Sequence, residues 1–280
     1  MTSQIKTVFL LVLLSGIIFV IGGAVGGRAG LLFALGIALV MNVGSYWYSD
    51  KIVLRMYKAR EVSASEAPML HAAVEELAAN AGIPKPKVCI VPDQTPNAFA
   101  TGRNPENAVV AVTEGILRTL NPEELKGVLA HEIAHIANRD ILIQSVAGVM
   151  ATAIMFLGNM LRFTAIFGGR SNQNSSPIAA IALAIIAPIA AALVQMAISR
   201  SREYLADATG ARYCHNPKAL ASALNKLSTA NQMRPMQEGN QATAHICIVA
   251  PFSGQKSMAS LFSTHPPMEE RIRRLQAMQV

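Results

Sequence analysis

The sequence predicts an α-helical membrane anchor with four candidate transmembrane helices, joined to a mainly α-helical α+β domain. The composition is the first observation behind this prediction. Of the 280 residues, 52% are hydrophobic and 15% are charged, whereas an average soluble domain is about 25% charged. The second observation is that the hydrophobic residues gather in four long stretches. A helix needs about 20 such residues to cross the hydrocarbon core of a bilayer.

The first two stretches lie near the N-terminus and are separated by a single charge. Residues 7–27 and residues 29–49 contain no charged side chain, and only Arg28 stands between them. This arrangement predicts a tight helical hairpin. A cleaved signal peptide is disfavoured, because the first run exceeds the roughly 7–15 apolar residues of a signal sequence and a second span follows at once.

The third and fourth stretches are weaker transmembrane candidates. They cover residues 141–161 and 178–198, with a polar loop at 170–176 between them. Both are rich in alanine, which is only mildly apolar, so buried helices of a soluble protein are the alternative interpretation. The polar residues that interrupt them are Gln144, Asn159 and Gln195.

Basic residues near the ends of the spans predict the orientation, because Lys and Arg accumulate on the cytoplasmic side of membrane proteins. Eight such residues lie on the side that carries both termini, against three on the other side. We therefore expect the polar segments 51–140 and 200–280 in the cytoplasm. The first group is Lys6, Lys51, Arg55, Lys58, Arg60, Arg139, Arg200 and Arg202, and the second is Arg28, Arg162 and Arg170.

The net charge narrows the classes of binding partner, and the cysteines indicate whether disulfides are present. The formal charge of +7 permits an anionic partner. We do not expect nucleic acid, because only 5% of residues are aromatic and no run of Lys and Arg is interleaved with them. The cysteines are odd in number and widely spaced, unlike a disulfide framework. Cys89, Cys214 and Cys247 are therefore expected to be buried free thiols.

The polar segment 51–140 has the pattern of a mixed α/β structure. Residues 66–81 place hydrophobic side chains at helical spacing. Three short runs of the same segment predict strands, at 87–91, 97–101 and 108–112. The segment 200–280, in contrast, is mainly helical in pattern.

A helix with a clear start follows the third of these strands. Asn121 suits the N-cap, and Pro122 suits the first helical position. Glu123 and Glu124 suit the positive end of the helix dipole. The helix should run from Pro122 past His135.

This helix carries the motif His131-Glu132-Ile133-Ala134-His135. Residues four apart lie on one face of a helix, so both imidazoles can reach the same metal ion. Glu132 stands beside them and can take a proton from a metal-bound water, whose pKa zinc lowers to about 7. This is the H-E-x-x-H pattern of zinc peptidases. The alternative is an exposed helix face that carries two histidines by chance.

A catalytic zinc site also needs a third protein ligand and one open position. Glu203 is the best candidate, and Asp207 shares its helical face four residues later. Glu203 could bind the metal while Asp207 accepts the free N–H of a ligand histidine and fixes its tautomer. His265 is the runner-up for the third ligand. A solvated helix face is the alternative for the two carboxylates.

The run from His131 to Asp140, His-Glu-Ile-Ala-His-Ile-Ala-Asn-Arg-Asp, together with Glu203-Tyr204-Leu205-Ala206-Asp207, resembles the HtpX-type membrane metalloproteases. This family is similar to the CAAX prenyl proteases and the Oma-type peptidases. The resemblance covers nearly the whole chain, including the closing Thr264-His265-Pro266-Pro267 segment. It implies one zinc ion per chain, with His131, His135 and Glu203 as ligands and Glu132 as the general base.

The resemblance also implies residues that meet the substrate. Asn97 opens an Asn97-Ala98-Phe99 edge strand, which in relatives lies along the substrate backbone. That agrees with recognition by strand addition. His265 and Arg271 match residues that contact the scissile carbonyl in relatives, where hydrogen-bond donors stabilise an oxyanion. The alternatives are an ordinary turn residue for Asn97, and a helix start and a solvated face for His265 and Arg271.

As a function, the resemblance implies an integral-membrane zinc metalloendopeptidase of membrane protein quality control. It would cleave misfolded or damaged membrane proteins at the cytoplasmic face of the plasma (inner) membrane of a bacterium. Four candidate spans are fewer than the prenyl proteases have, which argues against a chamber for lipid-modified substrates. A non-catalytic zinc scaffold and a prenyl-protein protease remain as alternatives, and the oligomeric state is left open.

We therefore expect four parts along the chain. The expected active site lies near the membrane surface, because the zinc helix ends where the third span begins and Glu203 follows the fourth. The four parts are a transmembrane hairpin at 1–50, a first peptidase segment with the zinc helix at 51–140, a second transmembrane hairpin at 141–199, and a second peptidase segment with the third zinc ligand at 200–280.

Overall fold

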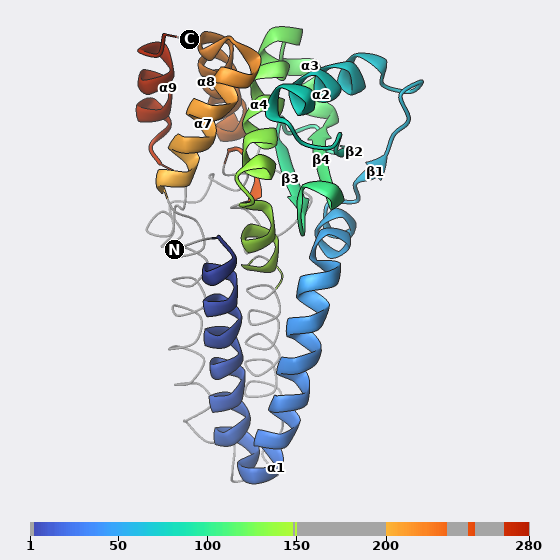
Figure 1. The fold of residues 1–280 in the computed structure, drawn as a ribbon, viewed down its shortest axis with the longest axis vertical. Helices are drawn as coiled ribbons and strands as arrows, with labels where there is room; N and C mark the ends of the chain where they lie inside the picture. The colour runs from blue at the N-terminus through green and yellow to red at the C-terminus, as the bar shows by residue number, and fades with distance from the viewer. Residues whose placement is uncertain (1–2, 148, 150–199, 234–245, 250–265, 280) are drawn as a thin grey trace.

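The computed structural model describes all residues except 1–2, 148, 150–199, 234–245, 250–265 and 280. Figure 1 shows two parts, a stem formed by a long pair of helical arms and a head of helices with a small sheet at one side. The stem is α1, Ser3–Met56. The head contains the described elements from β1 to α4 and from α7 to α9.

Helix α1 reverses its direction at Gly27, so that its two arms run side by side (Figure 1). Gly27 has φ 55° and ψ −135°, a backbone conformation that glycine adopts readily because it lacks a Cβ. The Asn42 side chain of the second arm donates a hydrogen bond to Ser15 Oγ of the first at 2.8 Å. The tight hairpin predicted around Arg28 is therefore present, with its turn at Gly27.

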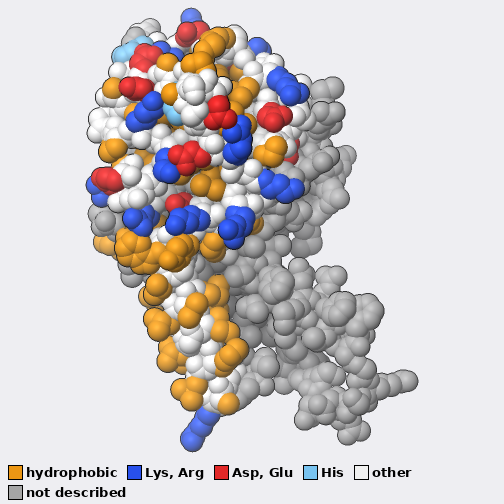
Figure 2. Space-filling view, turned by 90° about the vertical axis from the view of Figure 1, so that its right-hand side faces the viewer, with side chains coloured by type: hydrophobic (Ala, Val, Ile, Leu, Met, Phe, Trp, Pro, Cys, Tyr) orange, Lys and Arg blue, Asp and Glu red, His pale blue; other side chains and the backbone are white. Residues whose placement is uncertain are grey.

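Within the described residues, one helix is long and apolar enough to cross a membrane, the arm Gly27–Met56. Its hydrophobic side chains face outward, with Leu32 and Phe33 each 73% exposed. In Figure 2 hydrophobic side chains cover the stem, and a row of Lys and Arg side chains lies along the adjoining base of the head. This arrangement suits a helix that leaves a lipid bilayer at the base of the head.

The four predicted spans can be compared with the structure only in part. The spans at 7–27 and 29–49 fall on the two arms of α1. Of the span at 141–161, residues 141–147 and 149 are described and are helical, whereas the rest of it and the whole span at 178–198 lie outside the described residues. One membrane-capable helix is therefore established, whereas an anchor of four transmembrane helices stays a prediction.

The sheet forms one side of the head and has the strand order β1-β2-β4-β3 (Figure 1). β2 and β4 are parallel, and the other two neighbouring pairs are antiparallel. The three strands predicted from the sequence are confirmed, although β3 begins at Ala98 rather than Asn97. The strands are β1 Arg60–Glu61, β2 Lys87–Val91, β3 Ala98–Gly102 and β4 Ala108–Thr113.

The helices of the head gather around α4, Pro122–Ala137, which runs through its centre (Figure 1). One hydrophobic core joins the sheet to these helices, with Leu77, Val110, Leu129 and Leu224 among its members. All three cysteines are buried free thiols, as expected. The other helices are α2 Pro68–Ala81, the 3₁₀ helix η1 Pro105–Asn107, α3 Glu114–Thr119, α7 Arg200–Cys214, α8 Pro217–Met233 and α9 Met268–Gln276.

Two glycines allow α7 and α8 to lie very close to α4. A Cβ added to Gly210 of α7 would lie 2.8 Å from the backbone nitrogen of His131. One added to Gly127 of α4 would lie 2.9 Å from the backbone nitrogen of Leu220 in α8. Both distances are shorter than real Cβ contacts, so a larger residue at either position would push the helices apart. Gly210 thus sets how closely the helix of Glu203 approaches His131.

Candidate metal centre

The helix that carries the two histidines begins with a complete capping box. The Asn121 side chain accepts a hydrogen bond from the Glu124 N–H at 2.9 Å, and the Glu124 carboxylate accepts one from the Asn121 N–H at 3.0 Å. Pro122 lies in the first turn. These bonds satisfy N–H groups that a helix start leaves unpaired. They fix where α4 begins and therefore which face carries His131 and His135.

His131, His135 and Glu203 converge inside the head. Their side chains are 1%, 5% and 2% exposed. The Nε2 atoms of the two imidazoles lie 3.2 Å apart. The Glu203 carboxylate oxygens lie 3.7 Å from Nε2 of His131 and 3.4 Å from Nε2 of His135. One ligand atom from each residue lies within 4.8 Å of the others, so a single metal ion could contact all three.

Each histidine has a carboxylate beside its other ring nitrogen. Asp207 Oδ1 lies 2.9 Å from Nδ1 of His131, and Asp140 Oδ2 lies 3.4 Å from Nδ1 of His135. A carboxylate at Nδ1 holds the proton there and leaves Nε2 free for a metal. The sequence predicts this position for Asp207. Asp140 has the same geometry, and the signal that could have identified it is a carboxylate just beyond the C-terminus of the histidine helix.

Arg271 of α9 contacts both carboxylates of α7 in this network, Asp207 and Glu203. Its Nε and Nη2 donate to the two carboxylate oxygens of Asp207 at 2.8 and 2.7 Å, which is a bidentate pair. Nη1 donates to the Ile248 carbonyl oxygen at 3.1 Å and lies 3.5 Å from Glu203 Oε2. Burial raises the pKa of the Asp207 carboxyl, but Arg271 and His131 together outweigh burial and lower that pKa to about 2. Asp207 is therefore held as an anion.

Two predicted substrate contacts have different outcomes. The Arg271 side chain is 0% exposed, and its donors are directed to Asp207 and Ile248. This position suits a residue that orients Asp207 and Glu203, whereas contact with a scissile carbonyl stays a prediction. His265, predicted as a second carbonyl contact and as the runner-up ligand, lies outside the described residues.

Glu132 lies between the histidines and the sheet. Its carboxylate accepts a hydrogen bond from the backbone N–H of Ala100 in β3. Its Oε1 atom is buried and has no hydrogen-bond partner among the residues that the structure describes. Burial raises the pKa of this carboxyl to about 7. Leaving a buried acceptor unpaired costs on the order of 1–3 kcal/mol, and perturbed groups of this kind cluster at functional sites.

These residues fit a divalent metal such as zinc. Two imidazole nitrogens and one carboxylate form a ligand set of catalytic zinc sites, which keep a fourth position open. Glu132 Oε1, which has no partner among the described residues, is a buried acceptor next to this set, as the deprotonation of an attacking water requires.

The edge of the sheet beside this site is covered by the chain itself. β3 occupies the edge position that the sequence predicts for residues 97–99. Ile248 donates its N–H to the Ala98 carbonyl oxygen at 3.0 Å, and Cys247 forms an antiparallel bridge with Phe99. Residues 246–249, which we call the cover segment, therefore take the place where a substrate strand was expected.

Asn97 holds this cover segment in position. Its side-chain amide donates to the Val249 carbonyl oxygen at 2.9 Å, and its backbone N–H donates to Thr113 Oγ1 at 2.9 Å. The side chain is fully buried. Substrate contacts by Asn97, Ala98 and Phe99 stay predictions, and they require the cover segment to leave the edge.

The fold and the site together define a class of protein. An H-E-x-x-H helix, a buried glutamate from a later helix and a sheet edge beside them are features of a zinc-type metallopeptidase. The comparisons with known proteins then give the family. Residues 64–279 match the sequence profile of Peptidase family M48. The chain belongs to peptidase family M48 and is a metalloprotease.

Curated relatives match nearly the full chain. The Protease HtpX homolog of Syntrophobacter fumaroxidans is 55% identical over 283 residues, covering 99% of this chain and 100% of the relative. Those of Desulfatibacillum aliphaticivorans and Pyrococcus furiosus are 57% and 58% identical, covering 98% and 97% of this chain and 89% and 94% of the relatives. The resemblance to HtpX-type proteases is confirmed. Together with the membrane-capable arm of α1, it makes this protein a membrane metallopeptidase.

A solved structure agrees with this fold. S. mikatae Ste24p matches with a TM-score of 0.51 and 18% sequence identity. The match covers 97% of this chain but only 65% of Ste24p, so this chain spans slightly less than two thirds of that protein. At this identity the likeness shows a shared fold alone.

Proposed function

We propose that this protein is a zinc endopeptidase that cuts misfolded or damaged membrane proteins, as part of membrane protein quality control. The observation that carries the proposal is the buried convergence of His131, His135 and Glu203 beside Glu132, whose Oε1 has no partner in the part of the chain that the structure describes. The first three residues would hold one zinc ion per chain. When bound, zinc polarises a carbonyl group and makes water a nucleophile near neutral pH.

Glu132 is the proposed general base. Burial places the pKa of its carboxyl at about 7, near the value at which one group both accepts and releases a proton efficiently at neutral pH. It would take a proton from the attacking water and pass it to the leaving amine. The hydrogen bond from Ala100 fixes the carboxylate while Oε1 stays available.

The surrounding residues would keep the ligands in place. Asp207 and Asp140 hold the Nδ1 sides of His131 and His135, so that both Nε2 atoms face Glu203. Arg271 is proposed to position Asp207 and Glu203 through its buried guanidinium. His265 is proposed to donate to the carbonyl oxygen of the scissile bond, where charge develops.

Membrane proteins are the proposed substrates because the site lies close to the stem. Tyr57, one residue past α1, packs its ring against Phe99 of β3 with 4.9 Å between centroids. Helix α4 ends at Ala137, and helix resumes at Ile141, where the third span is predicted to begin. A polypeptide leaving the bilayer would therefore be close to the edge of the sheet. We place the head in the cytoplasm, at the plasma (inner) membrane of a bacterium.

The test compares wild type with Glu132→Ala, both purified in detergent and incubated with zinc and an unfolded substrate such as casein. We expect wild type to cleave, a chelator to stop cleavage and added zinc to restore it. Glu132→Ala should bind as much zinc and not cleave. Zinc in both proteins without cleavage by either would favour a scaffold. A second panel adds farnesylated peptides, and cleavage of those alone would overturn the quality-control proposal.

A further inference from the structure

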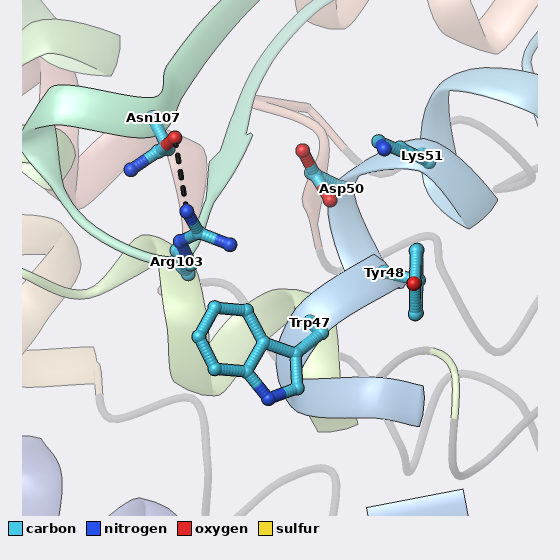
Figure 3. A pocket seen from close by; sticks show the side chains of 6 residues that line it. All are labelled: Trp47, Tyr48, Asp50, Lys51, Arg103 and Asn107. Atoms are coloured by element: carbon cyan, nitrogen blue, oxygen red, sulfur yellow. Dashed lines mark hydrogen bonds between the residues drawn. The ribbon is translucent and has the colours of Figure 1, made fainter. Parts of the chain in front are cut away.

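A cavity of about 290 Å³ lies where α1 enters the head, away from the metal centre. Figure 3 shows its lining side chains, four from the end of α1 and two from the connection between β3 and β4. Its volume is at the lower end of ligand pockets, roughly 300–1,000 Å³, which suits a small polar group. The lining residues are Trp47, Tyr48, Asp50, Lys51, Arg103 and Asn107.

The position of this cavity along α1 matches the expected level of lipid headgroups. Nineteen positions separate Arg28 from Trp47, which is about 29 Å along an α-helix. The hydrocarbon core of a bilayer is about 30 Å thick. If Arg28 marks one boundary, Trp47 and Tyr48 mark the other, and they are 50% and 53% exposed. Trp and Tyr gather at this boundary in membrane proteins.

Two cations face this cavity, and each lies over an aromatic ring. The guanidinium carbon of Arg103 is 4.7 Å from the centroid of the Trp47 ring, and its Nη2 donates to Asn107 Oδ1 at 3.3 Å. Lys51 Nζ is 5.3 Å from the centroid of the Tyr48 ring. These contacts hold the cations at the headgroup level, where Lys and Arg attract lipid phosphates.

The cavity also contains a carboxylate, Asp50 (Figure 3). A carboxylate only accepts hydrogen bonds and repels a phosphate, whereas it attracts an ammonium group. Two cations and one anion around a small cavity therefore match a ligand that carries both charges. A purely anionic headgroup would leave Asp50 facing a like charge.

We propose that this cavity binds the headgroup of a glycerophospholipid that carries a phosphate diester and a primary ammonium group. The phosphate lies against the cations Lys51 and Arg103, and the ammonium lies at Asp50. The acyl chains then follow the exposed apolar face of α1, which includes Leu39 and Val40 at 64% and 71% exposure. This binding is independent of peptide cleavage, because the lining contains no residue of the metal centre.

Trp47 makes the proposal directly measurable, because it is the single tryptophan of the chain. Its fluorescence is recorded in detergent while the full-length protein is titrated with dioctanoyl phosphatidylethanolamine. The same titration is made with dioctanoyl phosphatidylglycerol, dioctanoylglycerol and inorganic phosphate. We expect a saturable change with the amine-bearing lipid. The lipid without an amine should bind about fivefold more weakly, as for loss of one partly exposed charge pair.

Three substitutions assign the roles of the lining residues. Lys51→Gln and Arg103→Gln should each lower the affinity for both phospholipids about fivefold. Asp50→Asn should remove the preference for the amine-bearing lipid and leave phosphatidylglycerol bound at least as well. The matched control is Arg55→Gln, which removes an exposed cation of the same helix that does not line the cavity. It should leave the titration unchanged, and gel filtration in detergent checks that each variant is folded.

Several results would overturn the proposal. An equal response to dioctanoylglycerol would show that no phosphate is recognised. Inorganic phosphate acting at the same concentration as the lipid would assign the cavity to free phosphate. A loss in Arg55→Gln as large as in Lys51→Gln would mean general attraction to a basic surface. An unchanged preference of Asp50→Asn for the amine-bearing lipid would show that Asp50 does not bind the ammonium group.

Discussion

Helix α4 meets α7 on one side and α8 on another, and the two contacts are built from similar parts. Each contains a glycine without room for a Cβ, Gly210 toward α7 and Gly127 toward α8. Each contains a buried carboxylate paired with a cation. On the α7 side this is Asp207 with Arg271, and on the α8 side it is Glu124 with Lys226, at 2.7 and 2.8 Å.

The two contacts differ in how completely their polar atoms are satisfied. Glu124 accepts from Ser222 through Oε1, and from Lys226 and the Asn121 N–H through Oε2. Its cation is 45% exposed and reaches water. On the α7 side the guanidinium is fully buried, and next to this contact, toward β3, Glu132 Oε1 has no partner within the described part of the chain. A saturated cluster holds helices together, whereas the unsaturated one can bind a ligand and move a proton.

The largest expected effect is a loss of proteolytic activity that occurs on substitution of Glu132 but not of Glu124, on the α8 face of α4. Glu132→Gln keeps the size of the side chain but removes the proton acceptor, so casein cleavage should fall about 10³-fold. Zinc content, measured by atomic absorption, should stay at the wild-type level. Glu124→Gln is the matched control on the α8 face and should keep activity within a few-fold while lowering the melting temperature. Equal loss of activity in both variants would break the comparison.

A smaller effect concerns the carboxylate that the sequence motif did not identify. Asp140→Asn weakens the acceptor at Nδ1 of His135, so zinc affinity should fall about 10–100-fold. Competition with a chelator of known affinity measures this. Ser222→Ala removes a donor to Glu124 on the opposite face and should leave zinc affinity unchanged. Wild-type affinity in Asp140→Asn would mean that Asp140 has no part in orienting the ligand.

The two glycines allow a comparison at matched geometry. Gly210→Ala and Gly127→Ala should each destabilise the head by about 1–3 kcal/mol, because each Cβ meets a neighbouring backbone. Thermal unfolding in detergent measures this. Only Gly210→Ala should also weaken zinc binding, since it moves α7 and Glu203 away from His131. A similar loss of zinc affinity in Gly127→Ala would show that the metal centre depends on overall packing.

The smallest effect is a pH dependence on the α8 side. Burial raises the pKa of the Glu124 carboxyl, but Lys226, the Asn121 N–H and Ser222 outweigh it, so the net pKa lies below its ordinary 4.5. Its contribution to stability is therefore present above pH 4.5 and is lost as the pH falls toward the lowered pKa. The difference in melting temperature between wild type and Glu124→Gln should shrink from pH 7 to pH 4. A constant difference would contradict the assignment.

The sequence predicted best what depends on near neighbours. Asn121 and Pro122 mark the start of α4, and four-residue spacing places His131 and His135 on one face. Glu203 followed from the need for a third ligand. Arg271 lies in a run of charged residues that reads as a solvated face, yet it is fully buried. Its partner lies 64 positions away, and no local pattern encodes such a contact.

The cover segment shows the same limit at the edge of the sheet. The sequence predicted β3 and its edge position. It gave no sign that Val249 would pair with Asn97 across 152 positions. Asp140 was missed because a single carboxylate after a helix is common, and only the folded chain places it at His135.

If a substrate strand adds to the edge of β3, as the sequence predicts, the cover segment affects which polypeptides can bind there. The cover segment would then compete with the substrate strand while joined to the enzyme by the chain itself, and tethered segments on short flexible linkers act at effective concentrations in the millimolar range. The apparent dissociation constant of an added strand would be its intrinsic value divided by the fraction of time for which the edge is open. We therefore expect a short peptide at micromolar concentration to displace the cover segment from β3 only rarely. A long, unfolded chain held at the membrane beside the site would have a high local concentration of its own, and we expect it to displace the cover segment more readily.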